Sequence, residues 1–236
     1  QHHQLDFLLA LAVGMVAGIL VFARLIEFMM EAAEPVLWAF FFGVIAVSVL
    51  QIGAARAPRY LAAYGALGVL AGLLFLSLPS VDMSESMFAL FVAGMVAVSA
   101  WILPGISGSF VLLLLGLYDD VILAVNQLDW TFLLVLAGGC GSGLMLFTRA
   151  LGWLLLRFED ALLAFLTGFM ATALIRLWPW QIVASQSAPD AYGVFHTLQL
   201  PQQYAAAGSE AYLGLSLLAA LLGGAGIWLL SKLSPQ

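Results

Sequence analysis

The chain has 236 residues, of which 64% are hydrophobic and 8% are charged, and its formal net charge at pH 7 is −6. Soluble globular domains carry about 25% charged residues, so the composition excludes a single soluble domain and predicts an all-α polytopic membrane protein. Seven Lys and Arg residues are too few for a nucleic-acid-binding patch, and a single cysteine, Cys140, excludes both an internal disulfide and a cysteine-based zinc site.

Six apolar stretches are long enough to cross a bilayer as helices, because one crossing needs about 20 mainly apolar residues. In chain order they are Leu5–Met30, Val36–Ile52, Tyr60–Leu78, Trp130–Leu156, Ala161–Trp178 and Ala211–Leu230. We predict that residues 1–236 form a single transmembrane domain. The polar stretch 181–210, which contains His196, is expected to be an external loop.

A seventh apolar stretch, Met87–Tyr118, is long for one crossing and too short for two. Pro104 and Gly105 interrupt it, and such residues break helices. It is either one kinked crossing or a re-entrant hairpin that enters and leaves on the same side. Lys and Arg in short loops mark the cytoplasmic side, and the hairpin places five of the seven basic residues there, against three for a single crossing. The pattern therefore favours a re-entrant broken-helix hairpin, with Asp82 and Asp119 both outside.

The sequence also repeats itself at a shift of 125 residues. Without gaps, Phe7–Gln51 and Phe132–Arg176 share fifteen of forty-five residues. The predicted topology runs the two copies in opposite directions, which makes this an inverted repeat of the kind common in transporters. Duplication without transport is the alternative. The glycine pairs Gly14-x-x-x-Gly18 and Gly139-x-x-x-Gly143 are typical of helix-packing seams.

We place the first repeat at 7–80 and the second at 87–231, the second including the hairpin at 87–118. The counterpart of that hairpin would precede Leu5, and the chain begins at Gln1 rather than Met. The sequence is therefore expected to lack an N-terminal segment that held a matching hairpin.

The segment PGISGS is the densest candidate for a binding site, and its residues are Pro104, Gly105, Ile106, Ser107, Gly108 and Ser109. Small residues let a ligand approach the backbone closely. A second half-helix, expected to run from this segment to about Tyr118, would present free N–H groups and the positive end of its dipole. With the serine hydroxyls, these groups would suit a phosphate. The alternative is a proline kink whose serines bond back to the helix.

Arg24 and Arg149 occupy equivalent positions in the two copies and are further substrate-binding candidates. An ionisable residue inside a span is a functional-site hypothesis, and the planar fork of Arg suits phosphate. Snorkelling to the interface is the alternative. Tyr118, Asp119 and Asp120 would line the outer mouth as a solvated rim or as coupling groups. We predict no catalytic residue, no metal ligand and no cofactor.

The run LPGISGSFVLLLLGLYDDV resembles the second signature of the bacterial polyprenyl-phosphate transporters, a PopT-type family formerly described as a domain of unknown function. The segments LVFARLIEF, FFGV and LFTRALGWLL are similar to the same family. A first family motif of the form PGVSGGT is absent, in agreement with a missing N-terminus. The resemblance implies translocation of undecaprenyl phosphate across the cytoplasmic membrane, for recycling in envelope polymer synthesis. It places Pro104, Gly105, Ser107, Gly108 and Ser109 in the signature.

The expected partners are polyprenyl-phosphate lipid and membrane lipids, with no nucleic acid, and the oligomeric state stays open. One alternative is an enzyme, a membrane undecaprenyl-diphosphate phosphatase. Such enzymes carry PG-x-S-R-S, whereas Gly108 stands where that Arg would be, and no glutamate-rich motif lies inside a predicted span. A second alternative is a secondary transporter for a small solute or ion.

Overall fold

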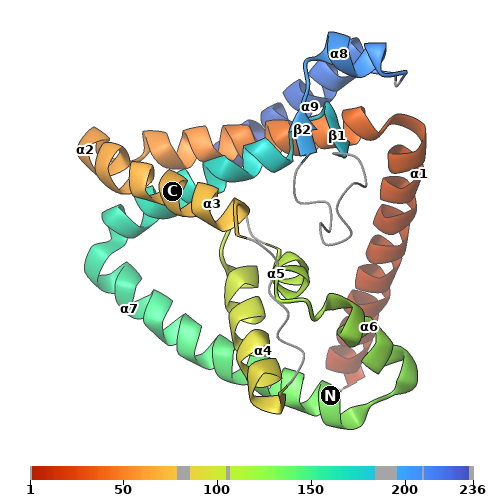
Figure 1. Cartoon of the computed structure of the whole chain (residues 1–236), viewed down its shortest axis with the longest axis vertical. Helices are drawn as coiled ribbons and strands as arrows, with labels where there is room; N and C mark the ends of the chain where they lie inside the picture. Colours follow the sequence, from red (N-terminus) through yellow and green to blue (C-terminus); the bar gives the residue numbers. More distant parts are fainter. Residues whose placement is uncertain (1, 79–85, 105–106, 184–195, 209, 234–236) are drawn as a thin grey trace. The chain divides into compact units, whose positions relative to one another are not determined.

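The computed structural model describes residues 2–78, 86–104, 107–183, 196–208 and 210–233 (Figure 1). Its helices are α1 (His2–Ala54), α2 (Pro58–Tyr60), the π-helical turn η1 (Leu61–Gly65), α3 (Ala66–Leu76), α4 (Met87–Ile102), α5 (Gly108–Leu114), α6 (Tyr118–Gln127), α7 (Trp130–Arg176), α8 (Pro201–Ala206) and α9 (Leu213–Leu233). Two three-residue strands, β1 (Gln181–Val183) and β2 (His196–Leu198), pair within the segment expected to be a loop. Apart from that small sheet, the regular structure is helical, as predicted.

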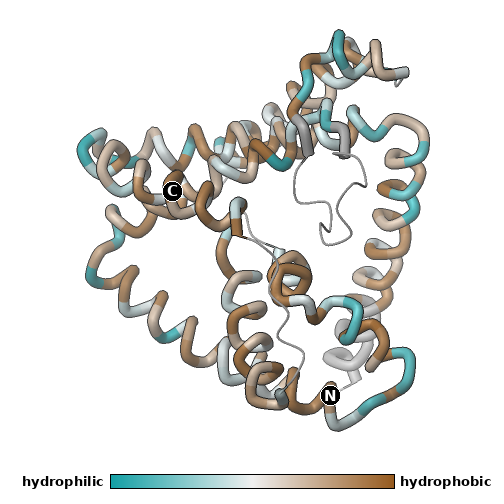
Figure 2. The backbone as a smooth tube through the Cα atoms, viewed as in Figure 1, coloured by the Kyte–Doolittle hydropathy of each residue, from teal (hydrophilic) through white to brown (hydrophobic). Residues whose placement is uncertain are grey.

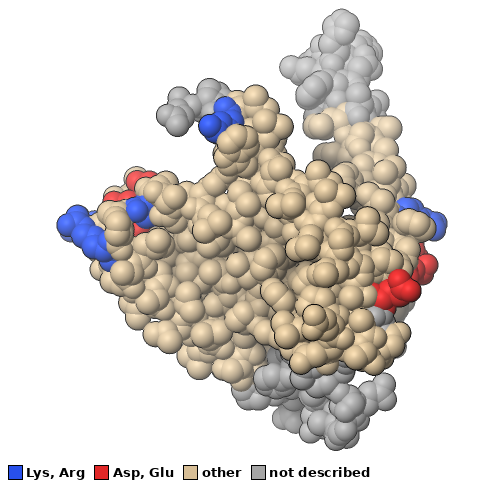
Figure 3. All heavy atoms as spheres, turned by 90° about the horizontal axis from the view of Figure 1, so that it is seen from above, with Lys and Arg blue, Asp and Glu red and all other residues tan. Residues whose placement is uncertain are grey.

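Among the described residues, four helical segments are long and apolar enough to cross a membrane: Val13–Ala54, Pro58–Leu76, Trp130–Arg176 and Leu213–Leu233. Figure 2 shows hydrophobic residues along most of these helices and hydrophilic ones mainly at helix ends and turns. On the face drawn in Figure 3, charged side chains form a few small groups in a surface of other residues. The protein is therefore a multi-pass α-helical membrane protein.

The two longest helices are kinked at equivalent positions of the repeat. The backbone leaves the helical region at Ala33 in α1 (φ −160°, ψ 62°) and at Phe158 in α7 (φ −139°, ψ 41°), and these residues are related by the 125-residue shift. Pro35 accounts for the first kink, because its ring cannot continue the helical ladder. Asp160 takes the place of that proline in α7, where it accepts a 2.9 Å hydrogen bond from Arg56. Each long helix thus contains two of the predicted spans, separated by a break.

The chain divides into two compact units whose segments alternate along the sequence. One unit comprises Gln1–Val44, Leu177–Gln181 and Leu198–Gln236, and the other comprises Ile45–Arg176 and Ile182–Thr197. The predicted hairpin and its neighbours α3 and α7 belong to the second unit. The boundary inside α1 falls between the kink and the end of that helix.

In the second unit, α3 and the η1 turn pack against α7 with almost no side chain between the backbones. A Cβ built on Gly168 would overlap the carbonyl oxygen of Gly65, and one built on Gly68 would overlap the carbonyl oxygen of Phe165. Only residues without a side chain allow so close an approach. Helix α3, predicted as the third span of the first repeat, therefore lies against the second half of α7.

The first unit contains the matching contact. A Cβ built on Gly43 would overlap the carbonyl oxygen of Ala220 in α9, and one built on Gly223 would overlap that of Phe40. Gly43 and Phe40 hold the repeat positions of the two α7 residues just described. Their partners are spaced three residues apart, as the partners in the second unit are. The two contacts match, as expected if each predicted repeat includes a third helix, and the bounds of the repeats stay a prediction. The opposite membrane orientation of the copies stays a prediction.

The glycine seam of α7 packs as predicted. A Cβ on Gly139 would overlap the carbonyl oxygen of Phe91 in α4, and one on Gly143 would lie 2.6 Å from the backbone of Met95. The equivalent seam in α1, Gly14–Gly18, has nothing within 4 Å of either position in the described part of the chain. The packing interpretation therefore holds for the second copy, and the structure shows no contact at the first.

Helix α7 begins with a side-chain cap. The Oδ1 atom of Asp129 accepts hydrogen bonds from the backbone N–H groups of Thr131 (3.0 Å) and Phe132 (3.1 Å). Loss of such a cap costs about 0.5–2 kcal/mol, so we expect Asp129→Ala to lower the melting temperature of the purified protein in detergent. Asp129→Asn keeps a capping oxygen and should stay near the unmutated protein. Equal losses in both variants would show that the charge matters rather than the cap.

Candidate substrate-binding site

The predicted hairpin is a pair of short helices that pack against each other. Helix α4 ends at Ile102, two residues before Pro104, because the residue that precedes a proline disfavours helical backbone. Helix α5 then returns along α4, and its Val111 packs between Ala97 and Ala100. The break in the apolar stretch is thus confirmed. Whether both ends of the hairpin lie on one side of the membrane stays a prediction, and Asp82, invoked for it, lies outside the described residues.

The second half-helix is shorter than the sequence predicts. Instead of running to about Tyr118, α5 ends at Leu114 after seven residues. Gly116 then adopts a positive φ of 69°, which glycine tolerates best, and α6 leaves at 106° to α5. A seven-residue helix aligns few peptide dipoles. The serine side chains therefore indicate an anion site more strongly than the helix end does.

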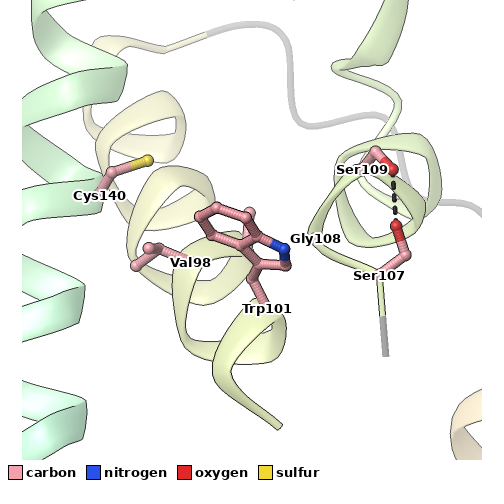
Figure 4. Close-up of a pocket in the computed structure, with 7 residues that line it drawn as sticks. Val98, Trp101, Ser107, Gly108, Ser109 and Cys140 are labelled. Carbon is pink, nitrogen blue, oxygen red and sulfur yellow. Dashed lines mark hydrogen bonds between the residues drawn. The ribbon is translucent and has the colours of Figure 1, made fainter. Parts of the chain in front are cut away.

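Ser107 and Ser109 bond to each other rather than back to the helix. Their Oγ atoms lie 2.7 Å apart (Figure 4), and Ser107 makes no capping bond although it occupies the N-cap position of α5. Other helical hydroxyls in the chain, such as those of Ser99 and Thr167, donate to the carbonyl four residues earlier. Among the described residues neither serine bonds back to a helix carbonyl, which argues against the alternative of back-bonded serines. The pair holds two O–H protons and uses one internally, so the second can be donated to a ligand.

These serines line an open pocket of about 420 Å³. Its lining residues are Ala97, Val98, Trp101, Ser107, Gly108, Ser109 and Cys140. Figure 4 shows the Trp101 indole pointing toward Gly108, while the two serine hydroxyls face each other. A Cβ on Gly108 would lie 2.9 Å from the carbonyl oxygen of Ala97, so this glycine sets how closely α5 approaches α4. Apolar walls with a few convergent polar groups are typical of ligand sites.

Four lining residues were not predicted: Ala97, Val98, Trp101 and Cys140. Trp101 is 74% exposed. The spacing of Ala97 and Trp101, four residues apart on one face of α4, is the signal that could have found them. Cys140 directly follows Gly139, the glycine at which α7 packs closely on α4. The side chain of Cys140 therefore reaches the same pocket.

The remaining predicted residues have other surroundings. The side chain of Arg24, in the first unit, is 86% exposed, with Glu27 at 3.8 Å. Arg149 is exposed on α7 and does not line the pocket. Asp119 and Asp120 occupy the first turn of α6, where carboxylates stabilise a helix start, beside Tyr118 and outside the pocket lining. Pro104 forms an exposed turn, and Gly105 and Ile106 fall outside the described residues.

Among the residues that the structure describes, no group of three or more His, Cys, Asp or Glu side chains is placed to hold a metal ion. Besides backbone groups, the described residues that line the pocket carry the serine hydroxyls, the Trp101 indole N–H and the Cys140 thiol. Hydroxyl and N–H groups of this kind hydrogen-bond an anion directly.

The helices and the hairpin define a multi-pass α-helical membrane protein with a polar break inside an apolar helix pair. Residues 1–192 match the family described as undecaprenyl phosphate translocase-like, and the chain belongs to that family. It is 37% identical over 183 residues to the polyprenyl-phosphate transporter of Vibrio cholerae serotype O1, an alignment that covers 74% of this chain and 58% of that protein.

A second relative, the polyprenyl-phosphate transporter of Staphylococcus aureus, is 32% identical over 95 residues, which cover 38% of this chain and 34% of the relative. The chain therefore spans less than two thirds of the length of either relative. No solved structure matches it. The resemblance seen in the signature sequence is confirmed at the level of the family.

Proposed function

We propose that the protein translocates a polyprenyl phosphate, undecaprenyl phosphate, across the cytoplasmic membrane, so that the carrier lipid is reused in envelope polymer synthesis. No covalent step is part of this proposal. The observation that carries it is the Ser107–Ser109 pair, whose hydroxyls line a pocket in the family signature. The names of the two relatives support the choice of substrate.

The pocket suits the two parts of such a lipid. An unpaired phosphate in hydrocarbon is very costly, so a carrier must replace its water with hydrogen-bond donors, and the serine pair supplies them. The apolar wall formed by Ala97, Val98 and the exposed ring of Trp101 suits the first isoprene units. Arg149 would meet the phosphate outside the pocket, because it does not line it. Arg24, in the first unit, stays a candidate phosphate ligand.

Removing the serine hydroxyls tests the proposal. A hydrogen bond to a charged group contributes about 1.5–3 kcal/mol, so Ser107→Ala or Ser109→Ala should weaken binding of a short-chain polyprenyl phosphate about tenfold or more. Binding of the matching polyprenyl alcohol should change little. The measurement is the affinity of the purified, monodisperse full-length protein for both lipids.

Ser99→Ala is the matched control, because that hydroxyl bonds to the Met95 carbonyl within α4 at 2.7 Å and does not line the pocket. It should leave both affinities unchanged. Equal affinity of the unmutated protein for alcohol and phosphate would contradict the proposal, since the site would then not recognise the phosphate.

A further inference from the structure

Trp101 lies in the last turn of α4, against the residue that separates the two serines of the pocket. A Cβ built on Gly108 would be 3.3 Å from the Trp101 Cβ, and Ser107 and Ser109 flank Gly108 in the sequence. In Figure 4 the nitrogen-bearing edge of the indole is the edge nearer to α5, and the six-membered ring lies on the other side. The polar edge of this side chain therefore faces the helix that carries the serines.

The indole N–H of Trp101 makes no hydrogen bond to any residue that the structure describes. Three other tryptophans donate their N–H to a carboxylate or a carbonyl of the protein at 2.9–3.0 Å: Trp38, Trp178 and Trp180. The remaining three are exposed and do not line the pocket: Trp130, Trp153 and Trp228. Trp101 is thus the tryptophan of this pocket, and its N–H is available to a ligand there.

The serine pair alone offers few donors to a phosphate. A phosphate group presents three strong acceptor oxygens, whereas the pair bonds internally at 2.7 Å and has one O–H left to donate. Among the other lining side chains, those of Ala97 and Val98 have no donor, and the Cys140 thiol is a weak one. An indole N–H donates and does not accept, so it suits an anion and is the strongest further side-chain donor of the pocket.

We propose that Trp101 is a substrate-binding residue of this site, and that its indole N–H donates a hydrogen bond to a phosphate oxygen of the lipid which the serine pair does not contact. The ring then covers the first isoprene unit, so that one side chain contacts headgroup and tail where they join. This inference rests on the proposed function, because it adds a donor to the same site. An interface anchor is the simpler role: such a tryptophan holds its helix at the level of the lipid headgroups.

The variants Trp101→Phe and Trp101→Leu separate the N–H from the ring. Trp101→Phe keeps an aromatic ring and removes the donor, so it should weaken binding of a short-chain polyprenyl phosphate about tenfold. Affinity for the matching alcohol should fall far less, because a hydrogen bond to an uncharged group is about half as strong. Trp101→Leu also removes the ring and should weaken both lipids, the phosphate more than the alcohol.

Trp153→Phe is the matched control, because the Trp153 side chain is 61% exposed, against 74% for Trp101, and does not line the pocket. It should change neither affinity. Melting temperature and monodispersity of the purified full-length variants are compared in parallel. Both Trp101 variants lack the N–H, so the ratio of phosphate to alcohol affinity in either folded variant decides.

An unchanged ratio would overturn the assignment. If both affinities fell together, Trp101 would be an anchor or a packing surface, and if neither fell, it would take no part in binding. Failure of the proposed function is a different result, because the unmutated protein itself would then show no preference for phosphate over alcohol.

Discussion

Replacing Gly168 with Ala is expected to destabilise the protein strongly, although Ala for Gly normally favours a helix by about 1 kcal/mol. The new Cβ would overlap the Gly65 carbonyl oxygen, and a backbone atom cannot rotate away as a side chain can. Overpacking of this kind costs about 1–3 kcal/mol and sometimes more. We expect a lower melting temperature in detergent and a smaller monodisperse fraction after purification.

Gly141→Ala is the matched control, because it lies on the same helix and a Cβ there meets nothing within 4 Å. It should leave stability unchanged or raise it slightly. Gly43→Ala should reproduce the loss in the first unit, since its Cβ would overlap the Ala220 carbonyl. A melting temperature for Gly168→Ala equal to that of Gly141→Ala would show that α3 and α7 do not approach so closely.

Gly108→Val is expected to weaken phosphate binding about a hundredfold in a protein that still folds. The Cβ would lie 2.9 Å from the Ala97 carbonyl oxygen and 3.3 Å from the Trp101 Cβ, so α5 must move off α4. That movement displaces both serines of the pocket. If each hydroxyl contributes about tenfold, the combined loss is about a hundredfold. The measurement is polyprenyl-phosphate affinity, made on fractions that remain monodisperse.

Gly152→Val provides the comparison, because a side chain at that α7 position meets nothing within 4 Å. It should bind polyprenyl phosphate as the unmutated protein does. Normal affinity in folded Gly108→Val would mean that the serine pair does not depend on the close approach of α5 to α4.

The breaks in the helices could be predicted because their causes are local in sequence. Pro35 and Pro104 each remove a donor from the hydrogen-bond ladder of a helix. The long helices α1 and α7 both bend where polar residues interrupt the apolar run. The length of α5 could not be predicted, since the four leucines before Gly116 favour a continuing helix. The glycine between them and Tyr118 instead adopts a positive φ and ends the segment.

The sequence also could not predict which helices pack against each other. Apolar faces of membrane helices resemble one another, so nothing in the residues of α3 says that it lies on α7 rather than on α1. The serine pair was predicted because small polar residues stand out in an apolar run.

The pairing of α3 with α7 and of α9 with α1 also bears on how the two predicted repeats depend on each other. If α3 belongs to the first copy and α9 to the second, each copy places its third helix on the second span of the other. A single copy would then leave one glycine contact and one helix without a partner. Two identical chains could complete both contacts by exchanging that helix, and such swapping is a low-cost route to a dimer. Within one polypeptide the same exchange needs no second chain.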